Sequence, residues 1–266
     1  MKKPAIAASS YLNTAPLCYS FLSGTQQSRA IFLSDEAPAK CSELLVQKEV
    51  DAALIPAIEY PRTADLKVVP GVCVASKHRV KSVVLVSRKP LEEVRSVALD
   101  THSRTSVALV KIILGSFLRV EASYEPAPPD LEAMLSGHDA ALIIGDPAMT
   151  IDRSAVRVYD LAEEWRRHTR LPFVFAFWAI RPESVGMIRE SGIDFEAAKE
   201  EGLAHAELIA EQYSASLRLE KRELLAYLTR NINYDLDAES LRGLNEYYRL
   251  AFQNGLIGPV RELEFI

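Results

Sequence analysis

Apolar residues are grouped along the N-terminal part of the chain in two alternating ways. Short runs at 3–8 and 30–33 have the length and the flanking turn residues of strands, and 51–60 predicts a buried strand that runs into a loop broken by Pro56. Between them, run length and spacing favour helices over 14–22 and 37–50. Alternation of strands and helices is typical of an α/β unit built on parallel strands.

The pattern then changes and restarts. Two stretches rich in β-branched residues, KVVPGVCVAS at 67–76 and VKSVVLVSR at 80–88, favour consecutive strands. Strands and helices alternate again over 96–146, and the apolar stretch LPFVFAFWAIR at 171–181 resumes extended structure. We therefore expect a second α/β unit inserted into the first, with two crossing strands and a hinge.

This organisation predicts two domains. The first comprises residues 1–88 and 174–266, and the second is an inserted α/β lobe of residues 89–173. From residue 194 onward, apolar residues at intervals of three and four predict three C-terminal helices, which we assign to the first domain. Asp237 is expected to cap the last of them and Gly255 to end it.

Composition and charge narrow the class of partner. The 266-residue chain is 48% hydrophobic and 25% charged, with a formal net charge of -5 and no dense Lys/Arg cluster. Nucleic acids and anionic membranes both need a concentrated positive patch, so we expect neither as a partner. No stretch reaches the ~20 apolar residues that span a bilayer. The N-terminus runs into serines too early for a signal peptide, so we expect a cytoplasmic protein.

Cysteine and histidine usage argues against a metal site. Cys18, Cys41 and Cys73 are odd in number and never form a CxxC pair, which favours neither a disulfide framework nor zinc. The histidines are scattered. The sequence motifs of P-loops, dinucleotide sites, zinc proteases and serine hydrolases do not occur. We expect no metal, no cofactor and a reducing compartment.

The segment SSYLNTAPLCYSFL, residues 9–22, joins the first strand to the first helix. Asn13 can cap that helix, Pro16 suits its first turn, and the free backbone N–H groups there can bind a carboxylate or phosphate. Tyr11 and Thr14 flank Asn13 and are also candidate binding residues. Simple helix capping explains the same residues without a ligand.

A similar arrangement follows in DTHSRTSVALVKIIL. Here Ser103, Arg104, Thr105 and Ser106 precede an apolar helix. Hydroxyl groups, an arginine and a helix dipole together suit an anion, so Arg104, Thr105 and Ser106 are candidate ligands. Two such helix starts could face one cleft. Capping is again the alternative.

Three further candidate positions, two of them polar, fall beside predicted strands. Ser82 lies near the start of a crossing strand, where its hydroxyl would point into the hinge region. Gly145 and Asp146 follow an apolar strand, at the carboxyl end where α/β sheets bind ligands. The alternatives are an ordinary polar strand position for Ser82 and an ordinary turn for the other two.

Five segments together resemble the MqnA family, and the similarity extends over nearly the whole chain. They are YLNTAPL, SRTSVALVKIIL, IIGDPAM, LPFVFAFWAIR and YLTRNINYDLDAESLRGLNEYYRLAFQNGLI. That family consists of chorismate dehydratases of the futalosine route to menaquinone, with the two-domain fold of type II periplasmic binding proteins. The resemblance implies this fold and chorismate as the substrate.

The resemblance also implies roles for individual residues. It makes Asn13 and Ser82 the residues that hold the carboxylates of chorismate, with Thr105 and Ser106 as weaker candidates. The matching segments offer no obvious His, Glu or Lys as general base. We expect the enolpyruvyl carboxylate of the substrate to take the C3 proton, while the protein orients it and stabilises charge. Asp146 is the alternative base.

Two other functions stay open. The related MqnD enzymes share the fold and act on a cyclised futalosine derivative, but their N-terminal ligand loop is of a CPNDT type, which YLNTAPL is not. A non-catalytic solute-binding protein is the second alternative, because the same fold most often serves as a binding module.

Overall fold

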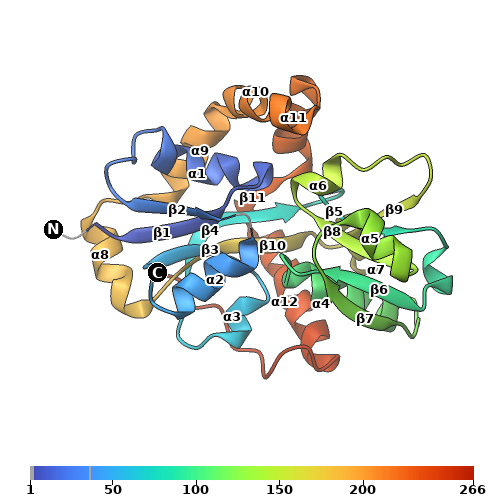
Figure 1. Ribbon diagram of the computed structural model, residues 1–266. Helices are drawn as coiled ribbons and strands as arrows, with labels where there is room; N and C mark the ends of the chain where they lie inside the picture. Colours follow the sequence, from blue (N-terminus) through green and yellow to red (C-terminus); the bar gives the residue numbers. More distant parts are fainter. Residues whose placement is uncertain (1–2, 36) are drawn as a thin grey trace.

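The computed structural model describes residues 3–35 and 37–266, which form two α/β lobes, each built on one sheet (Figure 1). The first sheet has the strand order β11-β4-β10-β3-β1-β2. β1 is parallel to β2 and β3, whereas β10 is antiparallel to β3 and β4, and β11 is antiparallel to β4. Its strands are Ala5–Ser9 (β1), Ile31–Asp35 (β2), Ala52–Pro56 (β3), Lys67–Ser76 (β4), Phe173–Ile180 (β10) and Asn233–Leu236 (β11). We call the part of the chain built on this sheet the first lobe.

The second sheet has the order β7-β6-β8-β5-β9 and forms the second lobe. β6 is parallel to β7 and β8, and β5 is antiparallel to β8 and β9. Its strands are Val83–Ser87 (β5), Ser96–Asp100 (β6), Ser123–Ala127 (β7), Ala140–Ile144 (β8) and Arg157–Asp160 (β9). The predicted α/β class is confirmed, and the strands of the second sheet lie in the sequence between β4 and β10 of the first.

Helices cover both sheets. Those of the first lobe are Ala15–Leu22 (α1), Pro38–Val46 (α2), Glu59–Arg62 (α3), Val185–Glu190 (α8), Phe195–Ala204 (α9), Ala206–Leu217 (α10), Lys221–Ala226 (α11) and Ala238–Gln253 (α12). Those of the second lobe are Thr105–Lys111 (α4), Leu131–Gly137 (α5), Asp146–Met149 (α6) and Leu161–Thr169 (α7). Short 3-10 turns are Leu12–Thr14, Leu91–Glu93 and Pro182–Ser184, and π-helical segments are Ile112–Phe117 and Tyr227–Asn231.

The chain passes between the lobes twice, after β4 and before β10. The first crossing occupies residues 77–82, because β5 pairs with β8 and β9 of the second sheet. A division at residue 88 therefore assigns β5 to the wrong sheet: its apolar pattern predicts a strand but carries no information about the pairing partner. The second crossing ends at the start of β10, within one residue of the expected position.

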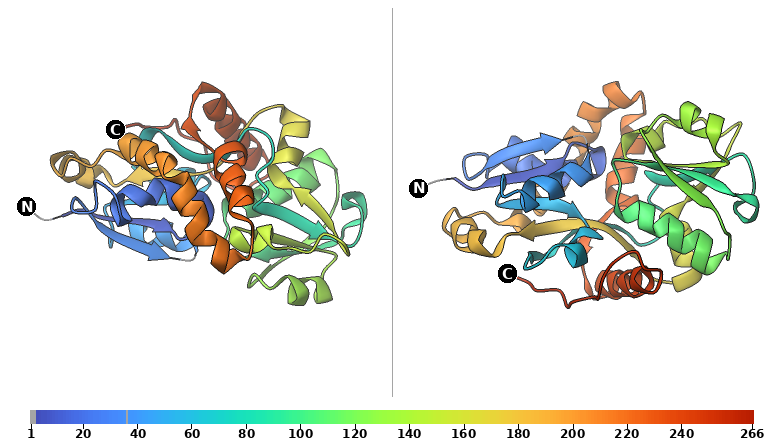
Figure 2. Two further views of the ribbon diagram at one scale, coloured as in Figure 1. Left: turned by 90° about the horizontal axis from the view of Figure 1, so that it is seen from above. Right: turned by 60° about the horizontal axis from the view of Figure 1, so that its bottom comes forward.

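The C-terminal helices lie beside the junction of the lobes. α10 and α11 lie on one side of it and α12 on the other (Figures 1 and 2). Asp237 caps α12 by accepting a hydrogen bond from the Ser240 N–H, as expected, and Gly255 follows its end with a φ of 66°. The region is not wholly helical, because β11 pairs with the edge of β4. A strand of four residues at a sheet edge leaves little periodicity to read.

One large apolar core extends through both lobes, and a smaller cluster lies beneath α5 and α6. Trp178 and Phe177 of β10 are completely buried within the large core, as is Trp165 of α7. β10 therefore joins the crossing to the centre of the first lobe. No helix in the described ranges is long and apolar enough to cross a membrane.

Candidate active site

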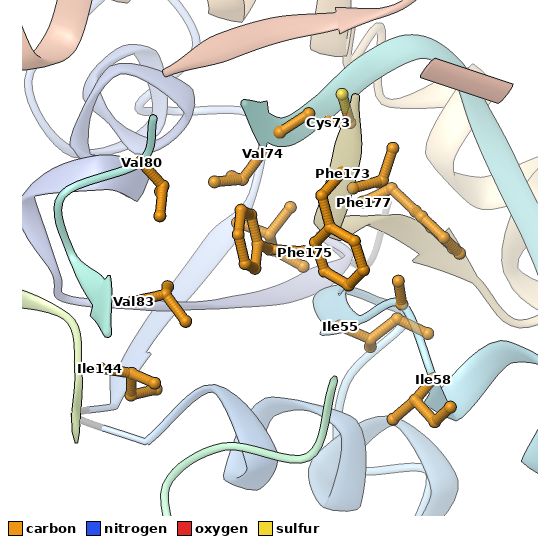
Figure 3. Packing of buried hydrophobic residues seen from close by; sticks show 14 of the residues in the cluster. Ile55, Ile58, Cys73, Val74, Val80, Val83, Ile144, Phe173, Phe175 and Phe177 are labelled. Carbon is orange, nitrogen blue, oxygen red and sulfur yellow. The ribbon is translucent and has the colours of Figure 1, made fainter. Parts of the chain in front are cut away.

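A cavity of about 50 Å³ lies between the two lobes, where the carboxyl ends of β1, β3 and β8 meet. One wall is apolar: Val83 and Ile144 of the second lobe face Val74 and Phe175 of the first (Figure 3). The polar side chains that line it come from the turn after β1 and from the start of α4, and they are Ser9, Tyr11, Asn13, Thr14, Ser103, Arg104, Thr105 and Ser106. The two predicted helix starts therefore do face one cleft.

Asn13 does not cap a helix. It lies within the 3-10 turn Leu12–Thr14, and the residue that precedes α1 is Thr14, whose side chain makes no capping hydrogen bond. The Asn13 Oδ1 atom is buried without a hydrogen-bond partner among the described residues. A buried polar atom in this state is costly unless something else satisfies it. Asn13 is therefore not a helix cap, and its amide oxygen keeps a hydrogen-bonding position next to the cavity that no described residue uses.

Thr14 shapes this turn. Its hydroxyl is buried and lies 2.6 Å from the Ser9 carbonyl oxygen and 2.8 Å from the Tyr11 carbonyl oxygen, so that it donates into the turn. Pro16 lies in the first turn of α1, as expected. Thr14 lines the cavity, but its hydroxyl proton is used within the protein.

Tyr11 closes one side of the cavity against the second lobe. Its ring packs on Gly145, where an added Cβ would lie 2.7 Å from the ring atoms, and Gly145 also has a φ of 70°. The Tyr11 hydroxyl lies 3.1 Å from His102 Nδ1. Gly145 is required both for its backbone conformation and for this contact.

Asp146 holds the same turn from the second lobe. Its Oδ1 atom accepts a hydrogen bond of 3.0 Å from the Leu12 N–H. Burial raises the pKa of Asp146 to about 6, although the Leu12 N–H acts in the opposite direction. Asp146 is not among the residues that line the cavity.

Arg104 is already paired. Its guanidinium donates to Glu59 Oε2 at 2.8 Å and to Glu43 Oε1 at 2.7 Å, and both carboxylates belong to the first lobe. The Glu59 side chain is only 7% exposed. The structure therefore gives Arg104 two protein partners across the cleft, where the sequence predicted an anionic ligand.

The hydroxyl groups of Thr105 and Ser106 also differ from the predicted anion ligands: one bonds within the protein and the other makes no hydrogen bond among the described residues. The Thr105 hydroxyl oxygen accepts a hydrogen bond from the Ile58 N–H across the cleft, and its carbonyl oxygen accepts one from the Tyr247 hydroxyl. The Ser106 N–H donates to Ser103 Oγ at 3.2 Å. Ser106 lines the cavity, and its hydroxyl makes no hydrogen bond within the described part of the chain.

Ser82 lies within the wall of the cavity and does not line the cavity surface. It is fully buried, and the residue that follows it, Val83, lines the cavity. Its carbonyl oxygen accepts the Gly145 N–H at 2.7 Å, and its Oγ atom accepts a hydrogen bond of 2.6 Å from the Tyr227 hydroxyl. Ser82 thus joins the hinge, the second lobe and the C-terminal region.

Sequence reasoning missed His102, Glu43, Glu59 and Tyr227. His102 lies inside the segment whose serines and arginine predict an anion site, but nothing in its spacing points to Tyr11. The two glutamates are ordinary polar positions on α2 and α3. Among the described residues, no cluster of His, Cys, Asp or Glu could hold a metal ion.

Two α/β lobes joined by two crossings, with a cavity between them, define the class of periplasmic-binding-protein-like folds. The chain is similar to the periplasmic aliphatic sulphonate binding protein SsuA of Escherichia coli, with a TM-score of 0.64 at 16% identity, covering 100% of this chain and 96% of that one. It is also similar to protein AF1704 of Archaeoglobus fulgidus, with a TM-score of 0.74 at 18% identity, covering 96% and 98%. At these identities the likeness concerns the fold alone, and it confirms the predicted two-lobed fold.

The sequence comparisons are more specific. A family model described as menaquinone biosynthesis matches residues 4–253. A chorismate dehydratase of Thermus thermophilus is 32% identical over 262 residues, which cover 89% of this chain and 91% of that protein. The chain therefore belongs to this menaquinone biosynthesis family, and the resemblance to MqnA proteins is confirmed.

Proposed function

We propose that the protein is a chorismate dehydratase, which eliminates water from chorismate to give 3-[(1-carboxyvinyl)oxy]benzoate in the futalosine route to menaquinone. The observation that carries this proposal is 32% identity to the Thermus thermophilus enzyme over 89% of the chain. The cavity between the lobes is the place for the reaction. Its apolar wall suits the carbocyclic ring, and its polar turn suits the groups that react.

Asn13 is the residue best placed to orient the substrate. Its buried Oδ1 atom needs a donor, which the C4 hydroxyl of chorismate provides. Its Nδ2 group can donate to a carboxylate. Asn13 and Ser106 line the cavity and can donate hydrogen bonds to the enolpyruvyl carboxylate close to the C3 proton. Ser82 lies buried in the cavity wall next to Val83 and is the further candidate for this contact.

The lobes must separate to admit the substrate. The cavity of about 50 Å³ is smaller than the roughly 150 Å³ that holds benzene in a protein interior. Opening breaks the contacts across the cleft, among them Arg104 with Glu59 and Tyr11 with His102. Closure then excludes water and fixes a flexible dianion in one geometry.

The proton acceptor is the substrate itself. Among the described residues that line the cavity, Arg104 is the only one with a full charge, and no carboxylate or imidazole is present. Loss of the C3 proton and the C4 hydroxyl aromatises the ring, which provides the driving force. The enolpyruvyl carboxylate takes the C3 proton, the C3–H electron pair forms the new ring double bond, and the C4–O bond breaks, so that the leaving hydroxide is released as water with that proton. The protein orients the carboxylate and stabilises the developing charge.

Incubation of the purified protein with chorismate, followed by chromatography, tests the activity. We expect chorismate to be consumed and 3-[(1-carboxyvinyl)oxy]benzoate to appear. Unchanged chorismate that nevertheless binds would favour a solute-binding protein. Conversion of the cyclised futalosine derivative, offered in parallel, would favour an MqnD-like enzyme instead.

We also propose that the enzyme works in the cytoplasm. All three cysteines are free and buried, which suits a reducing compartment. The net charge of -5 gives no attraction for nucleic acid, so that a small molecule is the expected partner.

A further inference from the structure

Ser82 has a hydrogen-bond partner in the C-terminal part of the chain. Tyr227 follows α11 directly and begins the π-helical segment Tyr227–Asn231. Its hydroxyl lies 2.6 Å from Ser82 Oγ, across a sequence separation of 145 residues. π-Helical turns often occur at functional sites.

The Tyr227 hydroxyl has Ser82 Oγ as its hydrogen-bond partner among the described residues. The Tyr227 side chain is completely buried, as are Leu224 of α11 and Leu228 of the π-helical segment. A tyrosine hydroxyl buried among apolar groups is costly without a partner, and Ser82 Oγ is the partner that the described part of the chain provides. Burial raises the pKa of Tyr227 well above its usual range, so that the hydroxyl keeps its proton, and it donates a hydrogen bond through that proton to Ser82 Oγ.

Because Ser82 Oγ is the acceptor in this bond, the proton of the Ser82 hydroxyl remains available for a second hydrogen bond. A serine hydroxyl has one proton and two lone pairs. When Tyr227 occupies a lone pair, the Ser82 proton is available to an acceptor elsewhere, and no second hydrogen bond of Ser82 Oγ exists within the described residues. Chained hydrogen bonds also polarise one another, so that the serine becomes a stronger donor.

We propose that Tyr227 is a positioning residue for the dehydration: it fixes the Ser82 hydroxyl so that its proton points to the substrate carboxylate. The inference rests on the proposed function. It makes the C-terminal helical region a part of the active site, in addition to its role as a support of the first lobe.

The first test is Tyr227→Phe, which removes one oxygen atom and keeps the ring. We expect kcat for chorismate to fall by about tenfold, the size expected for one hydrogen bond lost from the transition state, with KM changed by less than about threefold. The matched control is Tyr60→Phe. Tyr60 is also completely buried, but its hydroxyl bonds to Glu262 and Glu264 of the C-terminal tail, so we expect its kcat to be unchanged.

The second test is a double-mutant cycle with Ser82→Ala. If Tyr227 acts through Ser82, Tyr227→Phe should change kcat by less than about twofold when Ser82 is already alanine. The double variant should also unfold at a temperature no lower than that of Ser82→Ala, which leaves the Tyr227 hydroxyl buried and unpaired. This keeps the test valid even if one single variant is unstable.

Two results would overturn the inference: Tyr227→Phe with wild-type kcat, or the same fold loss in both backgrounds. In either case, turnover by the wild-type enzyme keeps the proposed function intact. A wild-type protein that leaves chorismate unchanged would instead remove the proposed function and this inference together.

Discussion

The starts of α1 and α4 have similar polar sequences and both line the cavity, yet their polar groups have different partners. Beside α1, the buried amide oxygen of Asn13 has no hydrogen-bond partner within residues 3–35 and 37–266. At the start of α4, Arg104 is paired with Glu43 and Glu59, and the Thr105 hydroxyl accepts the Ile58 N–H. In the first region the Asn13 amide oxygen therefore stays unsatisfied within the described residues. In the second, Arg104 and Thr105 hold the lobes together, and among the described residues there only the Ser106 hydroxyl stays unused.

A polar helix start is therefore not by itself evidence for a bound anion. An arginine with two hydroxyl residues beside it has more anion-binding chemistry than an asparagine and a threonine. Even so, the region with the weaker pattern holds the unsatisfied atom. A polar group is available to a ligand only if no other part of the protein already provides its hydrogen-bond or ion-pair partner. Substitutions in both regions test this difference.

The largest effect is expected for Asn13→Ala. Removal of a group that orients the reacting carboxylate should lower kcat by about 100-fold or more. Stability should change little, because Asn13 Oδ1 has no partner among the described residues to lose. Turnover of chorismate and thermal unfolding are the measurements.

Asn254→Ala is the control, since its amide bonds to the Leu250 carbonyl oxygen at the end of α12. Retention of a third or more of the activity would contradict a direct role for Asn13.

An intermediate effect is expected for Arg104→Ala. The change leaves the buried Glu59 with Arg62 as its remaining ion-pair partner, so the melting temperature should fall. KM should rise by about fivefold, because the closed form is weakened, and kcat should stay within about twofold. The control is Glu43→Gln, which removes one carboxylate that is 39% exposed and should alter both parameters less. A rise in KM of about 100-fold at an unchanged melting temperature would show that Arg104 binds the substrate carboxylate directly.

The smallest effect on turnover is expected for Asp146→Asn, which keeps an oxygen acceptor for the Leu12 N–H. Since burial raises the pKa of Asp146 from 3.8 to about 6, the protonated form is favoured by folding. Its contribution to stability is therefore complete below about pH 4 and is lost as the pH rises through about 6. The asparagine variant should melt a few degrees higher than wild type at about pH 8, and this advantage should disappear at about pH 4.

The same variant decides between the two bases. With the substrate carboxylate as base, Asp146→Asn should turn over chorismate within about threefold of the wild-type rate. Normal binding with no turnover would identify Asp146 as the base. In that case, wild-type activity would also fall as the pH drops below about 6, where Asp146 becomes protonated.

Much of the fold could be predicted because the apolar pattern is strong where burial is complete. β3, β5 and β8 are buried at every position, and each was expected as a strand. β9 and β11 were missed. Each has four residues at a sheet edge, where partial exposure weakens the pattern. The placement of β5 in the wrong sheet has a different cause, because pairing depends on strands that are far away in the sequence.

The sequence by itself determined the alternation of strands and helices, the insertion of one lobe into the other, and the family. These follow from local periodicity and from motifs that are read residue by residue. Only the tertiary structure decided which polar groups remain available. Arg104 meets Glu43 across 61 residues and Tyr227 meets Ser82 across 145, so that hydrogen-bond satisfaction at the cavity depends on how the lobes pack. Contacts between residues so far apart in the chain cannot be predicted from the local spacing of residues in the sequence.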